Sequence, residues 1–160
     1  MQKSNRLIFE PVNVENIDVL KGISVSAEQR KLLGDESDIV VVALETIKGR
    51  IVKPYIIIFE REIVGFFRLI LSPEKDLCSL SAFIISEDFQ GKGIGNQSLA
   101  IIIERVEDDF PDVTYLDLIV NSMNLAAINL YKKHGFVHVG KWREDFEIMQ
   151  KIFPRKHKVT

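Results

Sequence analysis

The sequence predicts a single α/β (α+β) domain over residues 1–160, with a mixed, mostly antiparallel sheet of about six to seven strands and about four helices. Three observations support this fold class. A length of 160 residues is typical of one domain, and 46% of the residues are hydrophobic, which is enough for a core. Three apolar runs follow one another between residues 55 and 85, as in an antiparallel meander. After residue 95 the pattern alternates between helical and strand-like segments.

In the first third of the chain, residues 7–11 form a predicted short strand that ends at Pro11. Residues 26–33 form a predicted helix, with Gly34 as its stop. The segment over 38–50 is ambiguous, because its valine-rich run has strand propensity. We favour a second helix there.

The middle of the chain is predicted as a three-stranded meander over 55–59, 63–71 and 77–85, with polar turns between the strands. An amphipathic helix follows, because apolar side chains recur at helical spacing from Leu99 to Val106.

The last third continues the alternation. A strand is predicted over 115–120 and a helix over 125–134, with Asn124 or Ser122 as N-cap and Gly135 as stop. Two closing strands are predicted, over 136–139 and 146–153.

The charge balance excludes a strongly basic protein. Lys and Arg number 21 and Asp and Glu number 23, a net charge of −2, so no nucleic-acid partner is expected. The single cysteine, Cys78, cannot form an internal disulfide, which predicts a cytoplasmic protein. We expect Cys78 to be a small buried side chain rather than a nucleophile. Residues 1–6 do not form a signal peptide, and no apolar run is long enough to span a membrane.

A glycine-rich segment over 90–95 (QGKGIG) lies between a predicted strand and a predicted helix. Its alternating glycines leave backbone N–H groups uncovered, and the helix adds unpaired N–H groups and the positive end of its dipole. Together these features predict an anion site suited to phosphates. The Walker pattern is absent, and the spacing is not the dinucleotide G-x-G-x-x-G. The alternative is a glycine-rich turn that only connects a strand to a helix.

A second group of residues follows the next predicted strand. Asn124, Ala127 and Tyr131 are spaced to share one helix face. Asn124 can donate and accept hydrogen bonds, Ala127 leaves room for a ligand, and Tyr131 adds a phenol. The alternative for Tyr131 is a packed aromatic.

These two segments resemble the cofactor motifs of the GCN5-related N-acetyltransferase (GNAT) family. Residues 90–95 match the family's Q/R-x-x-G-x-G/A loop, and residues 121–136 match its second cofactor motif in order and spacing. The resemblance covers residues 63–140 well and the N-terminal third loosely. It implies the GNAT fold, in which the strands over 77–85 and 115–120 splay around the cofactor.

The resemblance also implies acetyl-CoA as cosubstrate and no metal. Residues 90–96 would hold the pyrophosphate, and backbone groups of Phe83 and Ile85 would pair with the pantetheine arm. Asn124 would contact the same arm, and Tyr131 would be the general acid that protonates the departing thiolate. The full set of expected cofactor-binding residues is Phe83, Ile84, Ile85, Gln90, Gly91, Lys92, Gly93, Ile94, Gly95, Asn96, Asn124, Ala127, Tyr131 and Lys133.

The reaction that the family implies needs a neutral amine. An alkyl amine has a pKa of about 10.4, so neutralising it at pH 7 costs about 4.6 kcal/mol. Direct attack on the thioester therefore needs a base, a water chain or a lowered amine pKa, and a strand backbone N–H would stabilise the oxyanion. We name no general base. Glu74, Asp76 and Asp117 are the nearby acids in sequence.

Short segments over 9–12, 25–29 and 63–66 are similar to bacterial spermine/spermidine acetyltransferases. Those enzymes usually carry charged or bulky polar residues just before the pantetheine segment, where this chain has Ser81 and Ala82. We expect a small primary amine, such as a polyamine, as the acceptor. The alternatives are acetylation of a peptide α-amine or protein lysine, a non-catalytic acyl-CoA sensor, and a nucleotide-phosphate binder.

Two further predictions concern assembly and metals. Dimers are common in the GNAT family, so a homodimer is a candidate assembly. His134 and His138 are four residues apart, but Gly135 and a strand start separate them, so no metal site is expected there. Trp142 either lines a substrate pocket or packs as an ordinary aromatic.

Overall fold

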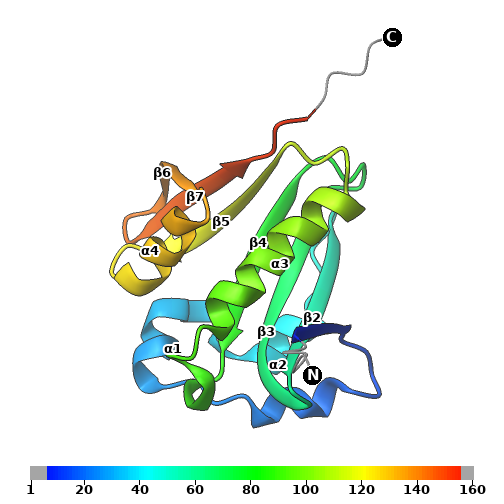
Figure 1. The fold of residues 1–160 in the computed structure, drawn as a ribbon, viewed down its shortest axis with the longest axis vertical. Coiled ribbons are helices and arrows are strands. Elements are labelled where there is room, and N and C mark those ends of the chain that lie inside the picture. The colour runs from blue at the N-terminus through cyan, green and yellow to red at the C-terminus, as the bar shows by residue number, and fades with distance from the viewer. Residues whose placement is uncertain (1–6, 156–160) are drawn as a thin grey trace, which may run out of the picture.

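A computed structural model describes residues 7–155 and contains one seven-stranded sheet in the order β1-β2-β3-β4-β5-β7-β6 (Figure 1). Figure 1 also shows α3 lying across one face of the sheet, with α4 beside it. The strands are β1 (Leu7–Pro11), β2 (Ile51–Phe59), β3 (Glu62–Leu71), β4 (Cys78–Ile85), β5 (Tyr115–Asn121), β6 (Val137–Arg143) and β7 (Phe146–Ile152). The helices are α1 (Ala27–Leu33), α2 (Ile39–Leu44), α3 (Ile94–Asp109) and α4 (Leu125–Lys133).

The pairing of β4 with β5 is parallel, whereas every other neighbouring pair in this sheet is antiparallel. The parallel pairing joins Cys78–Leu80 to Leu116–Leu118 and then stops, although β4 continues to Ile85. Figure 1 shows the two strands diverging beyond this point. The splayed strands that the family resemblance implies are therefore confirmed.

A β-bulge lies in β4 where the strands begin to separate. The register with β3 shifts between Phe66, which faces Ile84, and Arg68, which faces Ser81. Ala82 within this step has φ +50, a left-handed conformation that is uncommon for residues other than glycine. The bulge bends β4 away from β5 and opens the sheet.

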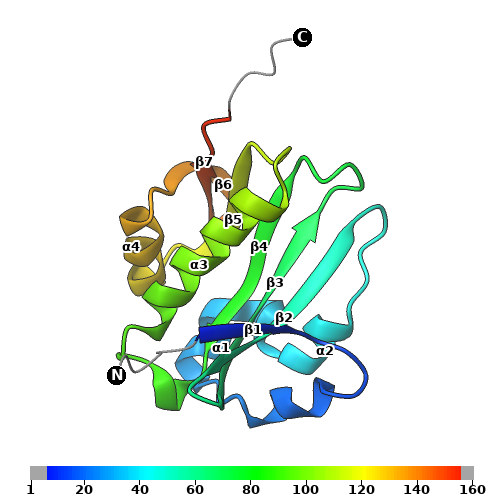
Figure 2. The same cartoon turned by 45° about the vertical axis from the view of Figure 1, so that its right-hand side comes forward.

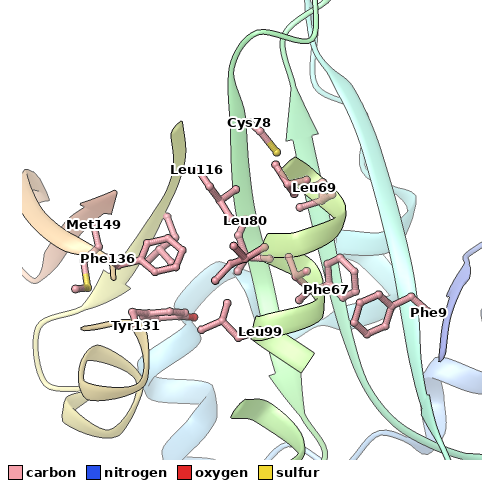
Figure 3. Close-up of a cluster of buried hydrophobic side chains, with 14 of the residues drawn as sticks. Phe9, Phe67, Leu69, Cys78, Leu80, Leu99, Leu116, Tyr131, Phe136 and Met149 are labelled. Carbon is pink, nitrogen blue, oxygen red and sulfur yellow. The ribbon is translucent and has the colours of Figure 1, made fainter. Parts of the chain in front are cut away.

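Two hydrophobic clusters cover the two faces of the sheet. The larger one packs α3 residues such as Leu99 against Phe67, Leu80 and Leu116, and it includes Tyr131 of α4 (Figure 3). The smaller one packs α2 and the 3-10 turn over 17–22 against the opposite face. Figure 2 shows α3 and α4 on the near side of the sheet and α1 and α2 at its lower end.

Most predicted elements agree with the structure. Helix α1 stops at Gly34 as predicted, but Ser26, which was predicted as its first residue, is its N-cap and forms a capping box with Gln29. The N-cap of α4 is Asn124, whose Oδ1 accepts a hydrogen bond from the Ala127 N–H. The alternative cap, Ser122, instead donates its hydroxyl to a Glu147 carboxylate oxygen at 3.0 Å.

Some predicted boundaries were wrong. The favoured helix over 38–50 contains only the six residues of α2, and β2 begins at Ile51 rather than at residue 55. Pro54 lies inside this extension. Its strand position is tolerated because the pairing of β1 with β2 ends at Tyr55. Beyond it the Pro54 carbonyl accepts a hydrogen bond from the Val12 N–H, a contact that needs no N–H from proline. Strand β6 also extends to Arg143 rather than ending at residue 139.

We expect Cys78 to resist alkylation in the folded protein. Burial raises the pKa of its thiol to about 12, and only 1% of the residue is exposed. At pH 8 about one thiol in ten thousand is then ionised. Iodoacetamide labelling, followed by mass spectrometry, should be at least about 100-fold slower without urea than with denaturing urea. Equal rates would contradict the buried placement.

Candidate active site

The loop that follows β4 presents backbone N–H groups at the start of α3. Gly91 has φ +75 and Gly93 has φ +80, conformations that favour glycine. The first hydrogen bond of the helix runs from the Gln97 N–H to the Gly93 carbonyl at 3.0 Å. The amides of residues 94–96 therefore precede the helical ladder and lie at the positive end of its dipole. The geometry fits the anion site predicted from the sequence.

A first cavity of about 640 Å³ lies in front of this loop. Its walls come from α1, the end of β4, the glycine loop and α4, elements that are far apart in the sequence. Of the predicted cofactor-binding residues, it brings together Phe83, Ile84, Ile85, Gln90, Gly91, Gly93, Ile94, Gly95, Asn124, Ala127 and Tyr131.

Three predicted residues are outside the described lining of this cavity. The Lys92 ammonium lies over the Phe89 ring, 5.4 Å from its centroid. The Asn96 Oδ1 lies 2.8 Å from the His134 Nε2, so its side chain points toward α4 while its amide stays at the helix start. Lys133 is exposed in the last turn of α4. Their cofactor contacts stay predictions.

The wall that α1 contributes to the first cavity was not predicted from the sequence. Ser26 and Gln29 line the first cavity, and the Gln29 Nε2 donates to the Ile85 carbonyl at 3.3 Å. The Gln90 Nε2 donates to the same carbonyl at 2.9 Å. A pantetheine amide that pairs with Ile85 would compete with these two side-chain amides. The spacing of Ser26 and Gln29 in the sequence is typical of a helix cap, but it does not indicate that Gln29 contacts Ile85.

A second cavity of about 530 Å³ adjoins the first. Its lining adds residues of α2, β3, β5 and the β6–β7 hairpin, among them Glu45, Arg68, Trp142 and Arg143. The residues that line both cavities are Leu32, Leu33, Phe83, Asn124, Ala127 and Tyr131. The two cavities therefore meet where β4 and β5 separate.

Tyr131 lies at this junction. The residue is 8% exposed, and its ring packs edge-on against Phe136 with centroids 5.6 Å apart. Figure 3 shows its hydroxyl oxygen pointing from α4 toward α3. The packed-aromatic interpretation is confirmed, because the ring lies in the core. The residue also lines both cavities, and its role toward a ligand stays a prediction. A phenol in this place can donate a proton to a group that lies between the cavities.

The second cavity contains a buried arginine that the sequence analysis did not single out. Arg68 is 4% exposed, its Nε donates to the Ser81 Oγ at 2.8 Å, and its Nη1 donates to the Val42 carbonyl at 3.1 Å. The Nη1 also lies 3.5 Å from the Glu45 Oε1. At the rim, the Arg143 guanidinium stacks 4.0 Å from the Trp142 ring centre.

The packing of Trp142 as an aromatic is confirmed, whereas its place in a substrate pocket stays a prediction. It lines the second cavity, and its ring packs edge-on against Phe146 with centroids 5.7 Å apart. Half of the indole stays accessible, since the residue is 47% exposed.

The two histidines have separate partners. His134 contacts Asn96, whereas the His138 Nε2 forms a hydrogen bond with the Glu147 carboxylate on β7. Among the side chains that the structure describes, which exclude those of residues 35 and 36, no group of three His, Cys, Asp or Glu is placed to hold a metal ion. Of the acids near in sequence, Asp117 accepts a hydrogen bond from Ser79, and burial raises the pKa of its carboxyl.

Comparisons with known proteins agree with this geometry. The model of the acetyltransferase (GNAT) family matches residues 24–136. A spermine/spermidine N(1)-acetyltransferase from Bacillus subtilis (strain 168) is 33% identical over 96 residues, which are 56% of this chain. The match spans 62% of the length of that curated relative.

Solved structures share the whole fold. An acetyltransferase from Thermus thermophilus has a TM-score of 0.73 and 26% identity, with 92% of this chain and 97% of the other covered. A GNAT family acetyltransferase from Elizabethkingia anophelis, with acetyl-CoA bound, has a TM-score of 0.65 and 18% identity, with 94% and 100% covered. The fold and the family match together show that this chain belongs to the GNAT acetyltransferase family. No helix in the described part of the chain is long and apolar enough to cross a membrane.

Proposed function

We propose that the protein transfers an acetyl group from acetyl-CoA to a primary amine of a small molecule. The observation that carries this proposal is the junction of two cavities at Tyr131. One cavity has the anion-binding features that a pyrophosphate needs. The other is lined by apolar, aromatic and charged side chains and suits an acceptor. An acetyl-CoA thioester placed between them would face both the amine and the phenol.

The first cavity fits acetyl-CoA in its local chemistry. A Cβ added at Gly91 would meet nothing within 4 Å, so open space lies against the loop backbone. The amides of residues 94–96 lie in the first turn of α3, where the helix dipole stabilises a phosphate. Beyond Leu80 β4 no longer pairs with β5, so the edge of β4 near Phe83 is a candidate for strand-like pairing with the pantetheine amides.

In this proposal the neutral amine attacks the thioester carbonyl directly. The new C–N bond forms, the C–S bond breaks, and the Tyr131 hydroxyl gives its proton to the departing thiolate. A backbone N–H of β4 near the bulge stabilises the oxyanion. The ammonium form of the acceptor gives up one proton to solvent before it attacks, and the nitrogen gives up a second proton as the C–N bond forms. One proton from solvent then returns to the Tyr131 phenolate, which restores the acid for the next turnover.

The acceptor is proposed as a polyamine on the strength of the Bacillus relatives. Both curated relatives carry spermine or spermidine in their names. Acetylation of a peptide amine is the second candidate, because Arg143 and Trp142 place the rim of the second cavity on the surface. A non-catalytic acyl-CoA sensor is the third, but a sensor gives no reason for a phenol at the junction.

An acceptor panel tests the proposal. Acetyl-CoA-dependent CoA release would be measured with spermidine, spermine, simple amines, amino acids, aminoglycosides and short peptides. Saturable release with polyamines or other small amines is expected. Release with peptides alone would move the activity to protein acetylation. Acetyl-CoA binding without release on any acceptor would favour the sensor, and protection by ATP or NAD instead of acetyl-CoA would favour a nucleotide site.

A further inference from the structure

The second cavity has an inner end and an outer part. Tyr131, Asn124 and Ala127 belong to both cavities, so they mark the end at which the acceptor would meet the thioester. Glu45 and Arg68 line the second cavity but not the first. If the proposed function holds, the reacting nitrogen lies near Tyr131. The remainder of the acceptor then extends toward Glu45.

Glu45 is a suitable ligand for a cation. Among the side chains that the structure describes, it is the one carboxylate in the lining of the second cavity. Its side chain is 45% exposed and contacts Arg68 through Oε1 at 3.5 Å. A carboxylate has about four acceptor sites, so this contact leaves capacity for a second positively charged donor.

Arg68 fixes where this carboxylate lies. Its guanidinium, buried under the cavity, bridges Ser81 on β4 and the Val42 carbonyl on α2. The Val42 carbonyl also accepts the Glu45 N–H at 3.3 Å, so the end of α2 is fixed to the sheet beside the carboxylate. Burial of a guanidinium requires a compensating charge, and Glu45 supplies one.

We propose that Glu45 binds a second ammonium group of the acceptor, other than the one that is acetylated, and that Arg68 is the positioning residue for it. This inference rests on the proposed function and deepens it, because it selects diamines over monoamines. Among the polyamines proposed above, Arg143 favours short diamines over spermidine and spermine, because its guanidinium stacks on the Trp142 ring at the rim of the same cavity and repels a further ammonium group. The same Arg143 would instead favour an acceptor with a carboxylate, so the test must separate these two classes.

Three acceptors of equal chain length provide the test: 1-aminobutane, 1,4-diaminobutane and 4-aminobutanoate. The wild-type kcat/KM should be at least about tenfold higher for the diamine than for the monoamine, as expected for one charged hydrogen bond. Glu45→Gln should reduce this ratio to about one, through a higher KM for the diamine, and leave the monoamine within about twofold. In this variant the glutamine amide oxygen can still accept from Arg68, whose guanidinium keeps its bonds to Ser81 and Val42, so the variant should fold.

Arg68 is tested by the same ratio. Arg68→Lys keeps the charge but not the planar fork, so it should give an intermediate ratio, whereas Arg68→Met should lose the preference as Glu45→Gln does. A purely structural role would lower kcat/KM for all three acceptors equally. The matched control is Glu104→Gln, an exposed carboxylate on α3 that lines neither cavity, and its ratio should match that of the wild type.

Two results would overturn the inference while the proposed function stands. The first is an unchanged diamine preference in Glu45→Gln. The second is a wild-type preference for 4-aminobutanoate, which would assign acceptor recognition to Arg143. Absence of CoA release with every amine, in a protein that still binds acetyl-CoA, would instead refute the proposed function and this inference with it.

Discussion

Tyr131→Phe is expected to lower turnover by about 100-fold or more while acetyl-CoA affinity changes by less than about threefold. The loss follows from the removal of the proton donor, which typically contributes 10²–10⁴-fold. Binding is retained because the phenylalanine ring keeps the edge-on contact with Phe136 and fills the same core position. Steady-state CoA release and calorimetric titration of acetyl-CoA measure the two effects separately.

The control for this variant is Tyr55→Phe. Tyr55 lies on β2, stacks on Phe67 at 5.0 Å and lines neither cavity, so the same hydroxyl deletion should leave turnover unchanged. Equal turnover in Tyr131→Phe and the wild type would remove Tyr131 from the proposed role. Loss of binding together with turnover would mean that the hydroxyl supports the cofactor site instead.

Gly65→Ala is expected to destabilise the fold by about 3 kcal/mol. An added Cβ would lie 2.4 Å from the Ile84 backbone oxygen, a contact that no flexible side chain can relieve. The backbone of β4 would have to move away from β3, and Ile84 and Ile85 line the first cavity. A lower urea midpoint and weaker acetyl-CoA binding should therefore appear together.

Gly140→Ala provides the comparison for this substitution. Gly140 also lies in a strand, but a Cβ there meets nothing within 4 Å. Its replacement should leave the urea midpoint unchanged or raise it slightly, because alanine loses less backbone entropy than glycine on folding. A Gly65→Ala protein as stable as the Gly140→Ala protein would contradict the close approach of β3 and β4.

The sequence predicted best those features that depend on local patterns. Glycine turns, asparagine caps and helical apolar spacing each have a short-range physical cause. The glycine-rich turn between β4 and α3, the helix through Leu99 and one of the two candidate caps of α4, Asn124, were therefore predicted correctly. The splayed strands came from the family resemblance, since nothing in the local pattern of β4 or β5 tells where their pairing ends.

The second cavity could not be predicted in the same way. Glu45 and Arg68 are 23 positions apart, and their contact depends on α2 packing over the sheet. One signal was present: Arg68 is a charged residue inside an otherwise apolar strand, which requires partners when buried. That signal identifies a buried charge but not its partner. The boundaries of α2 and β2 failed for a related reason, because valine-rich runs suit either structure.

The short contact between β4 and β5 has a consequence for cooperativity. The four N-terminal strands and the three C-terminal strands are joined only by the pairing of β4 with β5, which involves three residues of β4 and three of β5. A ligand in the first cavity would touch β4 and the start of α3 on one side and α4 on the other. The bound ligand would therefore couple local unfolding of the N-terminal strands to that of the C-terminal strands. At a ligand concentration 100 times its Kd, it would raise the free energy of unfolding by about 2.7 kcal/mol. Amide hydrogen exchange should slow on both sides of the division together, so the cosubstrate would act as a structural link as well as an acetyl donor.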